Sequence, residues 1–139
     1  MIATGCPYPI TKDPKGLLSP QKGVDQIKSD LLILLLTNPG ERVMLPTYGT
    51  PLRRYIFDQN DQTAASAVRQ LIINSIKTWE PRIVINSITV SNNIDTNYLS
   101  INDQGAQSGN ILQIIIEFYD PGNIQDVQQL KLELPISGS

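Results

Sequence analysis

The sequence predicts an α+β domain in which two helices are followed by a small antiparallel β-sheet of three to four strands. Apolar residues recur at helical spacing in two segments, 24–36 and about 60–79. After Pro81 the pattern changes to an alternation of period two, which is typical of strands. The length of 139 residues fits one domain, so we expect a single α+β domain at 23–139 and an arm at 1–22.

The arm is rich in proline, with Pro7, Pro9, Pro14 and Pro20 in its 22 residues. Prolines at this density block regular structure, so the segment is predicted to be extended. It is either a frayed tail or an arm that lies against a neighbouring protein.

The first helix is expected at about Val24–Leu36, with the stripe Val24, Ile27, Leu31, Leu34 and Leu35. The apolar run at its end resembles a buried strand, but Lys28 and Asp30 on the opposite side favour a helix. Pro39 disfavours helical geometry at the residue before it and ends the helix.

The segment Thr37–Asp58 is too long and too apolar for a simple connector. We expect a short edge strand at Arg42–Leu45. Apolar anchors for packing against the helices follow: Leu52, Tyr55, Ile56 and Phe57. The charged residues form a candidate docking loop, unless they are only solvated surface charges; its residues are Gly40, Glu41, Arg42, Arg53 and Arg54.

The second helix ends at Pro81 and is capped by Asn60 or Asp61. Its apolar stripe is Ala64, Val68, Leu71, Ile72, Ile76 and Trp79. The opposite side is polar, with Arg69, Gln70 and Lys77.

Strands are expected at Ile83–Ser91, Tyr98–Ile101, Ile111–Tyr119 and Val127–Leu134, with turns at Asn92–Asn97 and Asp120–Asn123. Ile111–Tyr119 has one fully apolar face and is predicted to be central. In the last strand the inward residues are Leu130, Leu132 and Leu134. This strand and the first are candidate sheet edges, where an incoming strand can add unless the helices or the arm cover them.

The composition excludes several functions. The net charge of −2 has no basic excess, so nucleic acid is not expected as a partner. There is no histidine, and the single cysteine, Cys6, forms neither an internal disulfide nor a metal cluster. The start of the chain is no secretory signal, and the six-residue run Leu31–Leu36 is too short to cross a membrane. We expect a soluble, cytoplasmic protein with no cofactor.

Catalysis is also disfavoured. Phosphate-binding motifs are absent, and histidine-based triads are impossible. A glycosidase-type carboxylate pair remains, with Glu80 as the acid and Asp58 or Asp61 as its partner. Arg82 near Glu80 lowers a carboxylate pKa, whereas a general acid needs a raised pKa. We therefore expect no enzyme, with a peptidoglycan hydrolase as the alternative.

Glu80-Pro81-Arg82 forms a stiff corner, because Pro81 fixes one backbone angle and ends the helix. Its acid and its base either dock to a partner or form an internal salt bridge that ties the helix to the sheet. The local sequence alone favours the internal salt bridge.

Two motifs in order resemble the small wedge subunit of contractile-tail baseplates, over about residues 24–136. The first comprises Thr37, Pro39–Met44, Pro46, Tyr48–Thr50, Leu52 and Phe57, and the second is Glu80–Ile83. The family includes the "lysozyme-like" wedge proteins of contractile phages and relatives in bacteriocins and type VI secretion systems.

The resemblance implies a structural role in a virion tail baseplate, assembled in the host cytoplasm. Glu80, Pro81 and Arg82 would contact the core helical bundle of larger wedge proteins, which changes the interpretation of this corner from internal salt bridge to docking site. The sheet would resemble the strand-exchange domain of tail sheath proteins and start the sheath by strand addition. Six-fold arrangement and contact with the tail tube or hub are further implications. A generic adaptor that reuses the fold is the remaining alternative.

Overall fold

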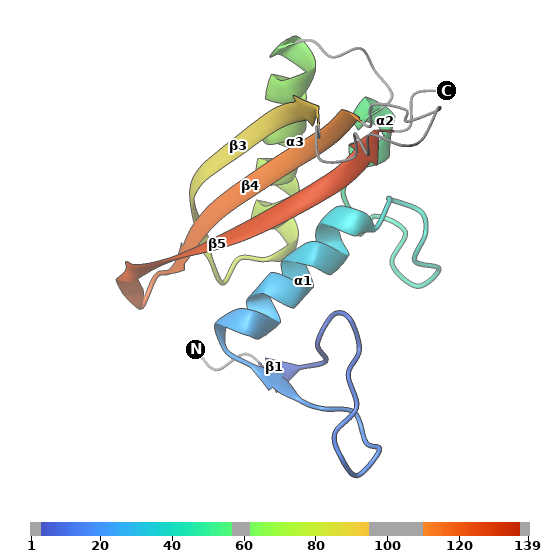
Figure 1. The fold of residues 1–139 in the computed structure, drawn as a ribbon, viewed down its shortest axis with the longest axis vertical. Coiled ribbons are helices and arrows are strands. Elements are labelled where there is room, and N and C mark those ends of the chain that lie inside the picture. The colour runs from blue at the N-terminus through green and yellow to red at the C-terminus, as the bar shows by residue number, and fades with distance from the viewer. Residues whose placement is uncertain (1–3, 57–61, 95–109, 137–139) are drawn as a thin grey trace, which may run out of the picture.

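The computed structural model describes residues 4–56, 62–94 and 110–136, and its architecture is the predicted α+β type (Figure 1). The main elements in chain order are α1 (Val24–Leu36), α2 (Leu52–Ile56), α3 (Gln62–Trp79), β3 (Val84–Ile94), β4 (Asn110–Asp120) and β5 (Asn123–Ile136). The three strands form an antiparallel sheet in the order β3-β4-β5, with β4 in the centre as predicted. α3 packs over β3, and α1 lies beside α3 and against β5, so both helices cover one face.

Both long helices lie where the apolar periodicity placed them. α1 has the predicted bounds, and it ends where the Thr37 side chain donates a 2.6 Å hydrogen bond to the carbonyl of Ile33. α3 buries Val68, Ile72 and Ile76 and exposes the predicted polar side. Its predicted capping residues, 60 and 61, lie outside the described residues.

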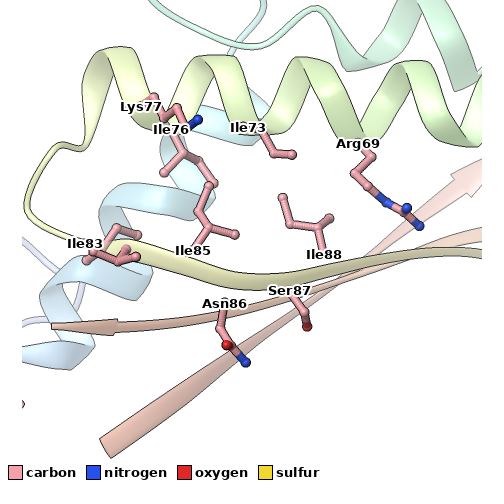
Figure 2. A pocket seen from close by; sticks show the side chains of 10 residues that line it. Arg69, Ile73, Ile76, Lys77, Ile83, Ile85, Asn86, Ser87 and Ile88 are labelled. Atoms are coloured by element: carbon pink, nitrogen blue, oxygen red, sulfur yellow. The ribbon is translucent and has the colours of Figure 1, made fainter. Parts of the chain in front are cut away.

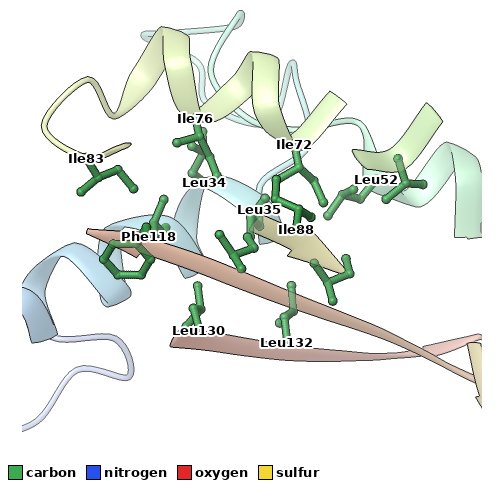
Figure 3. Packing of buried hydrophobic residues seen from close by; sticks show 14 of the residues in the cluster. Leu34, Leu35, Leu52, Ile72, Ile76, Ile83, Ile88, Phe118, Leu130 and Leu132 are labelled. Atoms are coloured by element: carbon green, nitrogen blue, oxygen red, sulfur yellow. The ribbon is translucent and has the colours of Figure 1, made fainter. Parts of the chain in front are cut away.

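The core lies between the helices and the inner face of the sheet (Figure 3). β4 buries the whole apolar face that its alternation predicts, Leu112, Ile114, Ile116 and Phe118. From β5, Leu130 and Leu132 point into the same core, and Leu134 packs at its margin. The residues predicted to face inward therefore hold the sheet against the helices.

Some local expectations are wrong. Arg42–Leu45 is a turn and not a strand: the Leu45 amide donates to the Arg42 carbonyl, and no described strand lies alongside to pair with it. The apolar anchors after Pro51, by contrast, do pack as expected: Leu52 is buried in the core and Tyr55 packs against it, both from a short helix, α2, while Phe57 lies outside the described residues. β3 continues through Asn92 to Ile94, because β4 pairs with it there and outweighs the turn preference of asparagine. The strand expected at Tyr98–Ile101 falls outside the described residues.

The N-terminal segment doubles back instead of running straight. Its short strands β1 (Thr4–Gly5) and β2 (Gln21–Lys22) pair with each other. The amide of Tyr8 donates to Ser29 Oγ, and this hydroxyl donates to Gln21 Oε1. These bonds hold the segment against α1 and explain why it is not extended. The division into an arm, 1–22, and a domain, 23–139, stays a prediction.

Among the helices of the described ranges, none combines the length and apolar character needed to cross a membrane.

Candidate docking surface

Arg82 lies between two carboxylates, one of which, that of Glu80, is buried. Its Nε and Nη2 donate to the two carboxylate oxygens of Glu80 at 2.5 and 2.6 Å. Nη2 also donates to Asp30 Oδ2 in α1, at 2.7 Å. We call Asp30, Glu80 and Arg82 the charged triad. An internal salt bridge is therefore present, as the local sequence favours, but it joins the end of α3 to α1 and not to the sheet.

The backbone at the end of α3 explains this geometry. The Glu80 amide donates a last helical hydrogen bond to Ile76, and the chain then turns at Pro81 and Arg82. The turn folds the guanidinium back over the acid two residues earlier. The Glu80 side chain is only 7% exposed, whereas those of Arg82 and Asp30 are 29% and 32% exposed. A partner can therefore reach Arg82 and Asp30 more easily than the Glu80 carboxylate.

The carboxylates keep the guanidinium charged. Hydrogen bonding to Glu80 raises the pKa of Arg82 most, and Asp30 adds to this, against the opposing effect of burial. A general acid at Glu80 would need a free proton-bearing oxygen, yet both of its oxygens accept from Arg82. The proposed partner carboxylates, Asp58 and Asp61, lie outside the described residues.

Two aromatic residues border the triad. The rings of Tyr48 and Trp79 meet edge to face with centroids 5.3 Å apart, and the Arg42 guanidinium lies 4.6 Å from the Tyr48 ring centroid. Burial raises the pKa of the Tyr48 hydroxyl. These side chains and the triad carboxylates line an open cleft of about 270 Å³, together with Ile33 and Leu34. The cleft brings together the two motifs that the sequence singled out.

The loop that carries Arg42 is tied at its base. The Thr50 amide donates to the Thr37 carbonyl at 2.9 Å, and the Gly40 amide donates to the Pro46 carbonyl at 2.7 Å. Glu41 accepts hydrogen bonds from the backbone and side-chain amides of Asn38. The candidate docking loop is thus an ordered projection.

The other two arginines of the predicted docking loop lie on α2. Arg53 and Arg54 are exposed, and Arg53 is close enough to Glu41 to contribute to lowering its pKa. They do not line the aromatic cleft. The structure therefore separates the predicted loop residues into a cleft residue, Arg42, and a cationic flank on α2.

Sequence reasoning missed the tip of this loop. Val43 and Met44 are 91% and 94% exposed, which is unusual for two adjacent large apolar side chains. The sequence does show an apolar pair between Gly40 and Pro46, but the composition of this segment predicts an edge strand and not an exposed tip.

A second hollow lies between α3 and β3 (Figure 2). Isoleucines from both elements line it, and the cations Arg69 and Lys77 stand on its α3 side. The lining isoleucines are Ile73, Ile76, Ile83, Ile85 and Ile88.

Neither outer margin of the sheet pairs with another strand within the described ranges. β3 and β5 are the outer strands, and no described strand pairs with the outer side of either. Each outer strand has one irregularity in its pairing with β4: β3 between Ile85 and Ser87, and β5 where the register shifts between Phe118 and Asp120. Beyond these, β3 is regular from Ser87 to Ile94 and β5 from Gln128 to Ile136. Leu130 and Leu132 bury their side chains, so only the β5 backbone and its outward side chains face a partner.

Comparison with known proteins gives a consistent result. The family model described as baseplate wedge protein gp25 matches residues 21–118. No curated protein sequence matches the chain significantly. Solved structures do match: a chain of the anti-feeding prophage baseplate, determined with six-fold symmetry, has a TM-score of 0.68 at 23% identity and covers 90% of both chains.

Two further structures have the same fold. A candidate tail lysozyme of Geobacter sulfurreducens has a TM-score of 0.65 at 24% identity, over 82% of this chain and 91% of that one. A chain of the postcontracted pyocin R2 baseplate has a TM-score of 0.52 at 24% identity, over 91% and 97%. At these identities the likeness establishes the fold and nothing more.

Proposed function

This chain belongs to the baseplate wedge protein gp25 family and is a structural component of a contractile injection system; on that premise we propose that it docks to larger wedge proteins and starts the tail sheath. The family match over residues 21–118 carries the proposal. In this proposal the chain is arranged with six-fold symmetry, in a tail baseplate that assembles in the host cytoplasm. The six-fold symmetry of the anti-feeding prophage baseplate supports this arrangement.

The docking part of the proposal concerns the cleft beside Glu80, Pro81 and Arg82. Because Glu80 is buried under Arg82, the partner would contact the reachable side of Arg82, Asp30 and the aromatic wall. A helix of the wedge core bundle fits this chemistry, since it can place a polar side chain against the triad and an apolar one against Trp79. Gly40, Glu41 and Arg42 would form the near lip of this contact, with Arg53 and Arg54 beside it.

Docking is tested by co-purification of the larger wedge proteins of the same particle with tagged variants. Arg42→Ser removes an exposed side chain of the lip and leaves the triad whole, so folding should be unchanged. We expect lost or weakened wedge binding with an unaltered melting temperature. Arg69→Ser, on the exposed side of α3 away from the cleft, is the matched control. Wild-type wedge binding by Arg42→Ser would contradict docking through this lip.

The sheath part of the proposal concerns β5. Its regular stretch from Gln128 to Ile136 and its outer backbone, which pairs with no described strand, support strand addition there, with Leu130, Leu132 and Leu134 anchoring the acceptor strand from inside. The alternative acceptor is β3, whose pairing with β4 is regular from Ser87 to Ile94.

Two matched positions can show whether the sheath strand adds to β3 or to β5. Thr89 of β3 and Lys131 of β5 both pair with Ile115 of β4, and both are exposed. In a Cys6→Ser background, Lys131→Cys should crosslink to cysteines placed along an arm of the sheath protein, and Thr89→Cys should not. If only Thr89→Cys crosslinks, the acceptor strand is β3 and not β5. If neither variant crosslinks, the proposal of strand addition to this sheet is contradicted.

A peptidoglycan hydrolase is suggested only by the candidate tail lysozyme of the same fold. The geometry disfavours it here, because Arg82 occupies both oxygens of Glu80. Concentrated pure protein should not clear cell walls. The hydrolase would be established if the wild type cleared cell walls and Glu80→Gln did not, provided that both proteins have the same melting temperature.

A further inference from the structure

We propose that Val43 and Met44 form an apolar anchor that inserts into a hydrophobic pocket with an acidic rim on a neighbouring baseplate protein. The inference rests on the proposed function, because the neighbour is another subunit of the same baseplate. It goes beyond the charged docking loop by assigning the main contact to two uncharged side chains.

Exposure is the first argument. Val43 and Met44 are 91% and 94% exposed, so almost all of their apolar surface is available to a partner. Burying two such side chains is favourable in proportion to the area removed from water. Methionine also adapts its shape to an irregular pocket, because it is unbranched and polarizable.

The fixed conformation of the loop is the second argument. The loop is closed by the Gly40 to Pro46 hydrogen bond, and the Leu45 amide donates to the Arg42 carbonyl across the tip. Below the tip, Arg42 lies over the Tyr48 ring. A projection that is held in place loses little conformational entropy when it inserts, so more of the binding free energy is retained.

Charge identifies the rim of the pocket. Arg42 directly precedes the tip and lines the same surface as Val43 and Met44, and Arg53 on α2 is close enough to Glu41 to lower its pKa. The one acid of the loop, Glu41, already accepts hydrogen bonds from Asn38 and faces Arg53. Arg42 and Arg53 therefore outnumber the one acid beside the tip, and a complementary pocket carries Asp or Glu side chains around an apolar centre.

The same charges argue against a second copy of this chain as the partner. Its apolar hollow between α3 and β3 carries Arg69 and Lys77 beside it, which would repel the arginines of the loop (Figure 2). A membrane is also a poorer fit. Two aliphatic side chains without an aromatic residue beside them at the tip bury too little area for stable insertion.

The experiment measures binding of the purified chain to the larger wedge proteins, with Val43→Ser/Met44→Ser against a matched pair. Leu17→Ser/Leu18→Ser is that control, because these two leucines are also adjacent and are 66% and 58% exposed. We expect the Val43/Met44 variant to bind at least about tenfold more weakly, as for an apolar hot spot, and the leucine pair to bind normally. Arg53→Glu should weaken binding mainly at low salt, because it reverses one charge facing the rim.

The outcomes are distinguishable. If the wild-type chain binds no wedge protein, the proposed function fails and this inference fails with it. If the wild type binds and Val43→Ser/Met44→Ser binds equally, only this inference is overturned. Two other results would also overturn this inference, in each case with a variant that still binds wedge protein. If the variant no longer self-associates, the tip binds a second copy of this chain. If the variant no longer floats with vesicles containing anionic lipid, the tip binds a membrane.

Discussion

Arg82 donates a 2.7 Å hydrogen bond to Asp30, a residue fifty-two positions earlier in the chain. Because the same guanidinium holds Glu80, one side chain joins the end of α3 to the middle of α1. The corner that the sequence offered as a docking site is therefore also part of the monomer's stability.

Arg82→Ala should lower the free energy of unfolding by about 2–4 kcal/mol, because it leaves the buried Glu80 carboxylate without its partner. Urea denaturation measures the effect. Arg82→Lys should lower the free energy of unfolding by less, since it keeps the positive charge and loses only the paired hydrogen bonds. The double variant Glu80→Gln/Arg82→Met should recover part of the loss, because no unpaired charge remains. An Arg82→Ala protein as stable as the wild type would show that the triad does not tie the helices together.

Two neighbouring isoleucines of α3 test the packing of the core. Ile72 is fully buried, whereas Ile73 is partly buried beside the hollow between α3 and β3. Ile72→Ala should destabilise the protein by about 2–5 kcal/mol, and Ile73→Ala by clearly less, since only the first leaves a closed cavity. Thermal or urea unfolding of both variants checks the order. Equal losses would mean that α3 is rotated from its described position.

The parts of this fold that the sequence predicted are those set by local periodicity. The stripe of α1 and the alternation of β4 each repeat over several turns or residue pairs, and both were placed within one residue of their observed bounds. Tertiary contacts support the same pattern there, so local and global preferences agree.

What the sequence did not predict depends on contacts between distant segments. Asp30 carries no mark of its partnership with Arg82, because the pairing is made only when α1 and α3 pack together. The turn at Val43 and Met44 resembles a strand in composition, and the backbone hydrogen bonds from Gly40 to Pro46 and from Leu45 to Arg42 show that the chain closes there. In the same way, Ser29 gives no sequence signal that it holds the N-terminal segment.

Gly49 is predicted to be essential for closing the docking loop. Its φ is +123°, and a Cβ atom there would lie 2.4 Å from the Thr37 carbonyl oxygen. Gly49→Ala should therefore lower stability by more than the roughly 1–2 kcal/mol of left-handed backbone strain alone. Gly40→Ala is the matched control, because its φ is also positive, +94°, but a Cβ meets nothing within 4 Å. Similar melting temperatures for the two variants would contradict the close approach of Gly49 to Thr37.

The carboxyl of Glu41 should titrate below its ordinary value of 4.5, because hydrogen bonds from Asn38 lower its pKa and Arg53 adds to the effect. A pKa that is lower in the folded than in the unfolded state stabilises the loop above about pH 4.5, and this contribution is lost as the pH falls through the folded value. NMR titration of the Glu41 side chain measures the pKa directly. In Asn38→Ala the pKa should rise part of the way toward 4.5, because the side-chain hydrogen bond is lost while the backbone amide of residue 38 still donates. In Arg53→Ala it should move less, since the charge of Arg53 is a smaller cause. A Glu41 pKa that does not respond to Asn38→Ala would mean that the Asn38 side chain does not donate to Glu41 in solution.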